Sequence, residues 1–403
     1  MSITTGLERM SSNQSCRSSV VPLSVPHIAG NEWTYVKECL DTGWVSSVGA
    51  FVERFERHVA SYVGAKYGVA TASGTAALHL ALQVAGVRPN DEVLVSTLTF
   101  IAPANAIRYL GAWPVFIDAE ADYWQIDPNR VQKFLVKECV ARQGGLYNRT
   151  SGRRLAAILP VDILGHPCAM RPIHDIAEKY GLPVIEDATE SLGAWYDGQK
   201  VGTLSGMACF SFNGNKLVTT GGGGMVVTDD ERFAQKVRYL STQAKDDPIE
   251  YVHHEVGYNY RLTNIQAAVG CAQMEHIDEF VAAKRKTAER YTMRLREIAG
   301  ITPMREATWA KSSFWMYTVL LNSEVLPIDR HDILKRLKEG GIESRPLWQP
   351  LHRSPAHAAS QAYGGNVAER IQRQALSLPC SVGLSHVDQD RVTDALIDIC
   401  QKE

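Results

Sequence analysis

The 403-residue sequence lacks several features that would narrow its function at once. It has no C-x-x-C pair among its eight cysteines, and no apolar run reaches the roughly 18 residues that a membrane-spanning helix needs. It also lacks a basic surplus, because 42 Lys and Arg residues are balanced by 44 Asp and Glu residues. We therefore expect no metal site, no disulfide framework, no membrane span and no nucleic-acid partner. The cysteines lie at positions 16, 39, 139, 168, 209, 271, 380 and 400.

The beginning of the chain also lacks the apolar segment of a secretory signal peptide. Residues 1–20 are polar and rich in serine. We predict a disordered extension over these residues, and a cytoplasmic protein whose thiols stay reduced.

What is present is a regular alternation of short apolar runs and amphipathic stretches between residues 67 and 242. Runs such as DEVLVST, LAAILPVDI and PVIEDA predict strands, while SGTAALHLALQVAG and RPIHDIAEKYG predict helices. This alternation is typical of an α/β protein with a mostly parallel sheet covered on both faces by helices. We interpret residues 127–143 as a helix and residues 144–154 (GGLYNRTSGRR) as a surface loop.

The pattern changes after about residue 272. A long charged helix is predicted over residues 275–300, and shorter strands and helices follow it. We therefore predict a large domain over residues 21–272 and a smaller C-terminal α+β domain over residues 273–403.

The most informative stretch is FSFNGNKLVTTGGGGM, in which Lys216 follows an apolar run and a small polar loop. Asp187 ends another predicted strand, PVIEDA. Because ligands of open α/β sheets bind at the carboxyl ends of strands, we expect both side chains at one site. A lysine there can form a Schiff base with pyridoxal 5′-phosphate (PLP), and the carboxylate can keep the pyridine nitrogen protonated. Taken alone, Lys216 could also be a surface lysine, and Asp187 could be a helix cap or a surface acid.

Five further residues have the right type and position for a PLP site. Gly74 and Thr75 begin a predicted helix, where free N–H groups bind phosphate. Ser211 could add a hydroxyl to the phosphate, Phe100 could stack on a planar ring, and Glu190 is close enough along the chain to reach the cofactor or substrate. Each residue has an ordinary alternative, namely a plain helix cap, a strand serine or a core aromatic.

Five blocks, SGTAAL, TFIAPANAI, PVIEDATESLGA, FSFNGNKLVTTGGGGM and GYNYRLTNIQAA, together resemble the DegT/DnrJ/EryC1/StrS family of PLP-dependent sugar aminotransferases. The resemblance extends from residue 21 over nearly the whole chain and implies fold type I of the PLP-dependent transferases. It implies that Lys216 and Asp187 are catalytic, with Lys216 bonded to PLP and Asp187 at the pyridine nitrogen. It implies further PLP contacts for Gly74, Thr75, Phe100, Glu190 and Ser211.

The resemblance also implies a homodimer with shared active sites. In this family the asparagine of the GYNYR-like loop reaches the cofactor of the partner chain, and we transfer this cofactor-binding role to Asn259. Arg261 in the same loop becomes a candidate for substrate binding. The chain departs from many members at Glu190, where they have Gln or His, and at residues 221–224, where many read GEGG.

The blocks PLSVPHIAGNEWTYVKECLDTGWVSS and TTGGGGM resemble the LegC-type branch of the family. That branch implies transfer of an amino group from L-glutamate to C4 of a UDP-linked 4-keto-6-deoxy-N-acetylhexosamine, for surface glycans such as lipopolysaccharide of the legionaminic acid or bacillosamine type. Trp44, Arg345, Trp348 and His352 are candidates near this substrate, and ordinary packing or surface placement is the alternative for each.

We weigh three alternative functions against this one. The chain could be a family aminotransferase for a dTDP-linked, GDP-linked or 3-keto sugar. It could be a sugar 3-dehydratase, but that chemistry uses histidine where this chain has Lys216. It could also be a PLP-binding regulator without turnover, which the presence of both Lys216 and Asp187 disfavours.

Overall fold

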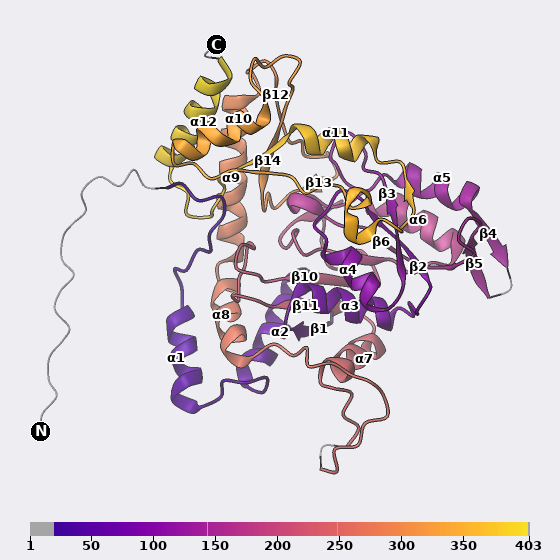
Figure 1. Ribbon diagram of the computed structural model, residues 1–403. Helices are drawn as coiled ribbons and strands as arrows, with labels where there is room; N and C mark the ends of the chain where they lie inside the picture. The colour runs from indigo at the N-terminus through magenta and orange to yellow at the C-terminus, as the bar shows by residue number, and fades with distance from the viewer. Residues whose placement is uncertain (1–19, 143, 248, 402–403) are drawn as a thin grey trace, which may run out of the picture.

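The computed structural model describes residues 20–142, 144–247 and 249–401 (Figure 1). Apart from Val20, the extension predicted for residues 1–20 lies outside the described residues. Among the described residues, no helix is both long enough and apolar enough to cross a membrane.

A seven-stranded sheet forms the centre of the molecule. Its strands are β1 (Tyr67–Thr71), β2 (Glu92–Ser96), β3 (Trp113–Ile117), β6 (Arg154–Leu159), β7 (Ile185–Asp187), β10 (Met207–Ser211) and β11 (Gly224–Thr228). They lie in the order β3-β2-β6-β7-β10-β11-β1, with β6 and β7 joined by isolated parallel bridges. All neighbours are parallel except β11, which is antiparallel to both β1 and β10. This is the mostly parallel sheet that the alternating pattern predicts.

Residues of the central strands are buried on both faces of the sheet. On β10, Ala208 and Phe210 point into one apolar cluster, whereas Cys209 points into another. Strands β2 and β3 alternate in the same way, and β6 also contributes residues to both of its clusters. A continuous apolar run in a strand therefore marks a position between two helical layers.

Helices cover both faces of this sheet (Figure 1). One face packs against α3 (Gly74–Val84), α4 (Ala102–Tyr109) and α7 (Glu231–Ser241). The other face packs against α2 (Ala50–Val63), α8 (Asn264–Met274), α5 (Pro128–Glu138) and α6 (Met170–Tyr180). Helix α1 (Glu32–Thr42) contacts α8.

The last third of the chain begins with α9 (Ile277–Leu295), which leads from α8 to a second, antiparallel sheet (Figure 1). This sheet has the order β12-β14-β17-β15, with bounds Ile301–Pro303, Tyr317–Leu321, Ala375–Leu378 and Arg345–Pro346. Helices α10 (Arg330–Glu339), α11 (Asn366–Gln374) and α12 (His386–Gln401) pack around it. The domain boundary predicted after residue 272 falls inside α8, and the division itself stays a prediction.

Two smaller pairings join the last third of the chain to the first part. Strand β16 (Ala362–Tyr363) lies parallel to β3 at the edge of the central sheet. Strand β13 (Ala310–Lys311) pairs with the hairpin of β8 (Trp195–Tyr196) and β9 (Gln199–Lys200). The C-terminal segments are therefore hydrogen-bonded to the sheet that carries the site.

The prediction for residues 127–154 was wrong in its second half. Helix α5 ends at Glu138, and the next residues form a β-hairpin of β4 (Cys139–Arg142) and β5 (Gly145–Asn148). The hairpin pairs with the beginning of β6, at Arg154 and Leu155, before the bridges that join β6 to β7. Its inward side chains, Cys139 and Leu146, are buried against the cluster under α5, which a surface loop could not provide.

Candidate active site

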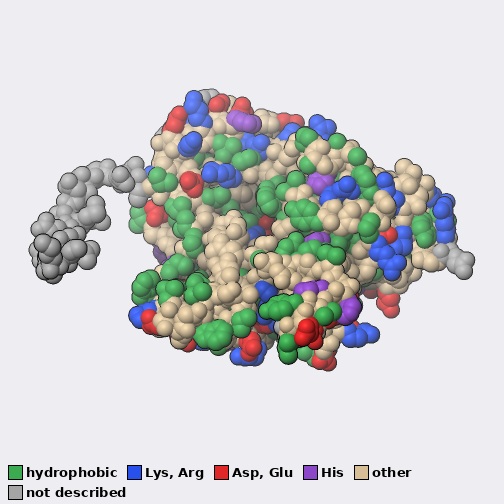
Figure 2. Space-filling view, turned by 60° about the horizontal axis from the view of Figure 1, so that its bottom comes forward, with side chains coloured by type: hydrophobic (Ala, Val, Ile, Leu, Met, Phe, Trp, Pro, Cys, Tyr) green, Lys and Arg blue, Asp and Glu red, His purple; other side chains and the backbone are tan. Residues whose placement is uncertain are grey.

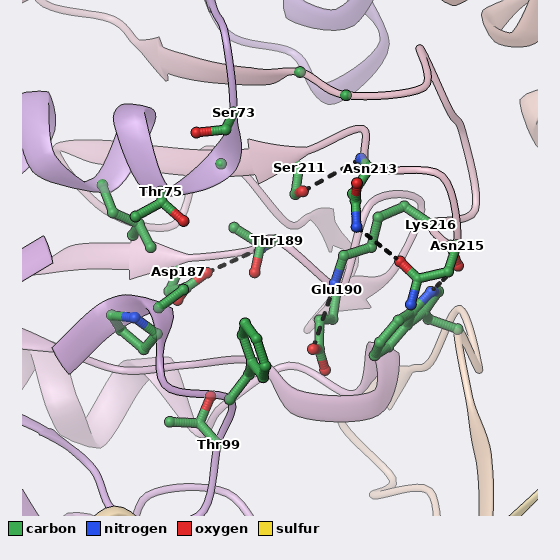
Figure 3. Close-up of a pocket in the computed structure, with 18 of the residues that line it drawn as sticks. Ser73, Thr75, Thr99, Asp187, Thr189, Glu190, Ser211, Asn213, Asn215 and Lys216 are labelled. Atoms are coloured by element: carbon green, nitrogen blue, oxygen red, sulfur yellow. Dashed lines mark hydrogen bonds and ion pairs between the residues drawn. The ribbon is translucent and has the colours of Figure 1, made fainter. Parts of the chain in front are cut away.

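A cavity of about 280 Å³ lies at the carboxyl ends of β7 and β10, beside the first turn of α3 (Figure 3). Its wall combines residues of the central sheet with two tryptophans from the last third of the chain. Eight of the predicted site residues line it, namely Gly74, Thr75, Phe100, Asp187, Glu190, Ser211, Lys216 and Trp348. The structure therefore brings together residues that are far apart in the sequence.

One end of the cavity is built to accept a phosphate. The hydroxyl of Ser73 accepts the N–H of Ala76 at 3.1 Å and so caps α3. Gly74 then brings the helix close to the end of β10, because a Cβ atom at this position would lie only 2.8 Å from the Cβ of Ser211. The backbone N–H groups of the first helical turn and the hydroxyls of Thr75 and Ser211 border the same end, where an anion is favoured.

Asp187, the last residue of β7, is 1% exposed. Its carboxylate accepts the N–H of Thr189 at 3.2 Å and also a hydrogen bond from the hydroxyl of that residue. Burial raises the pKa of the Asp187 carboxyl from 3.8 to about 7, although these hydrogen bonds and the Lys216 charge act in the opposite direction. A cationic or N–H-bearing ligand in the cavity would therefore restore the charged carboxylate.

Lys216 follows the polar turn after β10, and its amine points into the cavity (Figure 3). The Nζ atom lies 3.4 Å from Oε1 of Glu190, while Oε2 of Glu190 accepts the N–H of Leu164 at 2.8 Å. Burial raises the pKa of Glu190, and the Lys216 charge opposes that effect. The prediction that Glu190 lies near the reacting groups therefore agrees with its position, but its direct partner here is the lysine.

Sequence reasoning missed Trp315, which lines the cavity beside Lys216. The Nζ atom of Lys216 lies 3.8 Å from the centre of a Trp315 ring, close enough for a cation–π contact. Trp315 sits in a run that the sequence predicts as a strand, so its apolar neighbours gave no sign of a role in the site. Phe100 also lines the cavity and is 53% exposed, so its ring is accessible to a planar ligand.

Two predicted residues of the GYNYR loop lie outside the cavity that a single chain forms. Asn259 is exposed between Tyr258 and Tyr260, whose rings stack at 4.9 Å. Arg261 is turned inward, where it donates to the carboxylate of Glu56 at 2.9 Å. Within one chain, Arg261 is therefore engaged in an ion pair with Glu56, while Asn259 is exposed to solvent.

Three predicted substrate residues also do not line this cavity. Trp44 is 56% exposed after α1, and its carbonyl accepts a hydrogen bond from Asn264. Arg345 is exposed on β15. His352 is held between Thr97 and Glu369 through its two ring nitrogens, so both are already hydrogen-bonded within the chain. Of the four proposed substrate residues outside the GYNYR loop, Trp348 alone contributes to the cavity wall.

The cavity fits PLP on three observations. A helix start with two adjacent hydroxyls provides the phosphate end. A buried carboxylate, Asp187, has no cation in ion-pair contact among the described residues and can meet the pyridine nitrogen. An amine, that of Lys216, points into the same space from the turn after the neighbouring strand β10.

Comparison with known proteins agrees with this assignment. The sequence profile of the DegT/DnrJ/EryC1/StrS aminotransferase family matches residues 26–397. The chain is 41% identical over 377 residues to GDP-perosamine synthase of Caulobacter vibrioides. The aligned region covers 93% of this chain and 97% of that protein. It is 36% identical over 367 residues to GDP-perosamine synthase of Escherichia coli O157:H7, covering 91% and 94% respectively.

A solved structure extends the likeness to the fold. The DegT DnrJ EryC1 StrS aminotransferase from Brucella abortus matches with a TM-score of 0.84 and 26% identity, over 92% of this chain and 96% of that one. PLP fold type I and PLP as the cofactor are thereby confirmed.

The predicted nearness to the LegC-type branch is not supported, and neither is the reading toward legionaminic acid. The relatives at 41% and 36% identity are GDP-perosamine synthases. The LegC-type prediction rested on the blocks PLSVPHIAGNEWTYVKECLDTGWVSS and TTGGGGM, of which Gly222 and Gly223 line the cavity. Glycines present no side chain that could distinguish one sugar from another. The family itself is shown: the chain belongs to the DegT/DnrJ/EryC1/StrS family of PLP-dependent sugar aminotransferases.

Proposed function

We propose that this enzyme transfers an amino group from L-glutamate to the C4 keto group of a GDP-linked keto-deoxy sugar, giving a GDP-linked amino sugar such as GDP-perosamine. The observation that carries the choice of GDP is the 41% identity to a GDP-perosamine synthase over 97% of that protein. An aminotransferase converts a ketone into an amine, so a GDP-linked keto sugar is the substrate that this product requires. This proposal replaces the UDP-linked sugar with the GDP-linked alternative.

The residues of the cavity have distinct roles in this reaction. Lys216 holds the cofactor covalently between turnovers, and its free amine moves the proton at the carbon that gains or loses nitrogen. Asp187 contacts the pyridine nitrogen and stabilises its positive charge. When bound, PLP supplies an electron sink for the reacting carbon. Gly74, Thr75 and Ser211 hold its phosphate.

We also propose a homodimer in which Asn259 completes the partner's site. Lys216 is the one cationic side chain among the described residues that line the cavity, yet glutamate and a sugar diphosphate both bring negative charge. Further donors must therefore come from outside the wall that one chain forms. The stacked pair Tyr258 and Tyr260 presents Asn259 outward, and Figure 2 shows hydrophobic side chains exposed on the lower face of the molecule.

A panel of nucleotide-linked keto sugars tests the substrate. With L-glutamate as donor, we expect kcat/KM for the GDP-linked sugar to exceed that for UDP- and dTDP-linked sugars by roughly 100-fold or more, because a wrong base leaves polar groups of its site without hydrogen-bond partners. Preference for the UDP-linked sugar would contradict the GDP assignment and support the UDP-linked substrate that the sequence analysis predicts.

Two controls test the reaction itself. Glutamate alone should shift the absorbance of the PLP-loaded enzyme, and Lys216→Ala should abolish that shift. A spectrum that glutamate leaves unchanged would contradict amino transfer from this donor and favour a regulator. Mixed dimers of Lys216→Ala and Asn259→Ala chains test the shared site, because one of their two sites regains both residues and should turn over.

A further inference from the structure

Trp315 contacts both the amine of Lys216 and the turn that carries it. The amine lies 3.8 Å from the centre of the Trp315 ring. The indole N–H donates to the carbonyl of Asn215 at 2.8 Å, one residue before the lysine. Trp315 is 5% exposed, so its orientation is fixed by packing as well as by this hydrogen bond. One buried side chain from the last third of the chain thereby defines where the Lys216 amine rests.

The turn Ile163–Gly165 anchors both groups that hold this amine. The carbonyl of Gly165 accepts the N–H of Ser313, and a Cβ atom at Gly165 would lie 2.6 Å from the backbone nitrogen of Trp315. Gly165 has φ +91°, which only glycine adopts without strain. Leu164 in the same turn donates its N–H to Glu190 at 2.8 Å. The Glu190 carboxylate and the Trp315 ring, which both contact the Lys216 amine, are therefore positioned by the same turn.

Behind Trp315 lies a second lysine, Lys284 of α9, which is 3% exposed. Its Nζ atom donates to the carbonyl of Trp315 at 2.9 Å and lies 3.6 Å from the sulfur of Cys380. Among the described residues no carboxylate pairs with Lys284. A buried ammonium without a counter-ion is unfavourable for stability, and an apolar side chain of similar length would be better tolerated. Stability alone therefore does not explain a lysine at this position.

We propose that Trp315 is a positioning residue for Lys216, and that Lys284 holds Trp315 in place. The ring and Glu190 together keep the free amine directed into the cavity, so that it is ready to bond with the cofactor and to move the proton. This inference rests on the proposed role of Lys216. It assigns to two residues of the last third of the chain a function in a site otherwise built from the central sheet.

The first test uses Trp315→Phe and Trp315→Leu. Phenylalanine keeps an aromatic face but loses the N–H, whereas leucine loses both. We expect Trp315→Leu to lower kcat by roughly 3- to 30-fold, the range that a desolvated cation–π contact supplies, with KM for glutamate changed by less than about threefold. Trp315→Phe should recover part of the loss. Wild-type kcat in Trp315→Leu would overturn the proposal.

A second readout is independent of turnover. Cofactor-free protein is mixed with PLP, and the rate at which the absorbance of lysine-bound PLP appears is followed. Trp315→Leu should slow this capture by a similar factor, because its lysine amine is no longer held toward the cavity. A capture rate equal to that of wild type would contradict the positioning role.

Lys284→Met tests the residue behind the tryptophan. The thiol of Cys380 also donates to the Trp315 carbonyl, at 3.5 Å, so that carbonyl keeps a partner in the variant. We expect a thermal midpoint equal to or above that of wild type, together with slower PLP capture and lower kcat. Lys286→Met, two residues along α9 and exposed, is the matched control and should behave as wild type. A lower thermal midpoint with an unchanged rate of PLP capture would show that Lys284 is a structural residue. That result would overturn its proposed role in holding Trp315.

The same samples separate failure of this inference from failure of the proposed function. Borohydride reduction of PLP-loaded wild type, followed by peptide mapping, identifies the modified lysine. A label on another lysine would refute the role of Lys216 and with it both proposals. A label on Lys216 combined with wild-type behaviour of the Trp315 and Lys284 variants would overturn the positioning proposal alone. If Trp315→Leu does not fold, Trp315→Phe and Lys284→Met decide the matter through their capture rates.

Discussion

The Nδ1 atom of His352 lies 2.7 Å from the hydroxyl of Thr97, which directly follows β2. The other ring nitrogen lies 3.0 Å from Glu369 of α11, and the backbone N–H of Leu351 donates to the carbonyl of Thr97. This imidazole therefore joins a C-terminal helix to the strand end that leads to Phe100. Trp348, four residues earlier, lines the cavity.

We predict that His352 acts on stability and not on substrate affinity. His352→Ala removes hydrogen bonds from a largely buried site and should lower the free energy of unfolding by about 1–3 kcal/mol. KM for the sugar should change by less than about threefold in this variant. Thermal unfolding and steady-state kinetics measure the two effects, with the exposed His386→Ala on α12 as control. A large rise in KM with an unchanged thermal midpoint would instead place His352 at the substrate.

Asp187 makes the cofactor-free protein sensitive to pH. Because burial raises its pKa from 3.8 to about 7, the carboxyl contributes stability while protonated, and this contribution is lost as pH rises through about 7. The wild type should therefore unfold more easily at pH 8 than at pH 5 relative to Asp187→Asn, which cannot ionise. The difference in free energy should be on the order of a few kcal/mol at pH 8 and should vanish near pH 4.

Thermal midpoints of both cofactor-free proteins between pH 4 and 8 check this prediction. Comparison with the variant is needed because other buried carboxyls, including Glu186, also have a raised pKa. Asp187→Asn should also lose roughly 100-fold or more in kcat, because the pyridine nitrogen loses its charged partner. Parallel pH curves for the two proteins would contradict the raised pKa of Asp187.

Glu190 is expected to influence the acid side of the pH–rate profile. Its pKa is raised by burial, so it becomes protonated at a higher pH than an exposed glutamate and then loses its charge interaction with Lys216. Glu190→Gln should lower kcat by about tenfold or less and should flatten the acid limb of kcat/KM. An acid limb identical to that of wild type would assign it to another group.

The residues that were predictable share a local signal. Asp187 ends an apolar run, and Lys216 follows another after a short polar loop; parallel strand ends meet at one edge of a sheet, so their meeting follows from the pattern. Trp315 could not be found this way, because its contact with Lys216 depends on how the segment after α9 docks on the turn Ile163–Gly165. The hydrogen-bond partners of His352 could not be found this way either, since they come from the residue after β2 and from α11.

The β4–β5 hairpin shows the same limit in the fold. Residues 144–154, which include β5, are polar and contain glycine, as surface loops do, and nothing local shows that the beginning of β6 is free to pair with β5. Periodicity therefore predicts buried strands well and edge strands poorly, because an edge strand has only one buried face.

Arg261 forms an ion pair with Glu56 within one chain, and we predict that this pair stabilises the fold. Glu56 is buried and accepts from three donors, the N–H of Ala70 at 2.9 Å, Arg261 at 2.9 Å and Arg238 at 2.8 Å. Arg261→Met would leave this carboxylate with the half-exposed Arg238 as its remaining cation, since no other ion pair to Glu56 is present in the described part of the chain. The free energy of unfolding should fall by about 2–4 kcal/mol, because the buried carboxylate of Glu56 loses one of its two cations.

A double-mutant cycle decides between this role and substrate binding. If Arg261 serves Glu56, then Glu56→Gln should remove most of the stability loss that Arg261→Met causes, and the coupling energy should exceed about 1 kcal/mol. KM for the GDP-linked sugar should stay within about threefold of wild type in a variant that remains folded. Additive losses accompanied by a tenfold higher KM would show that Arg261 leaves Glu56 in the working enzyme and binds substrate. In that case the loop that presents Asn259 must change its conformation when two chains meet.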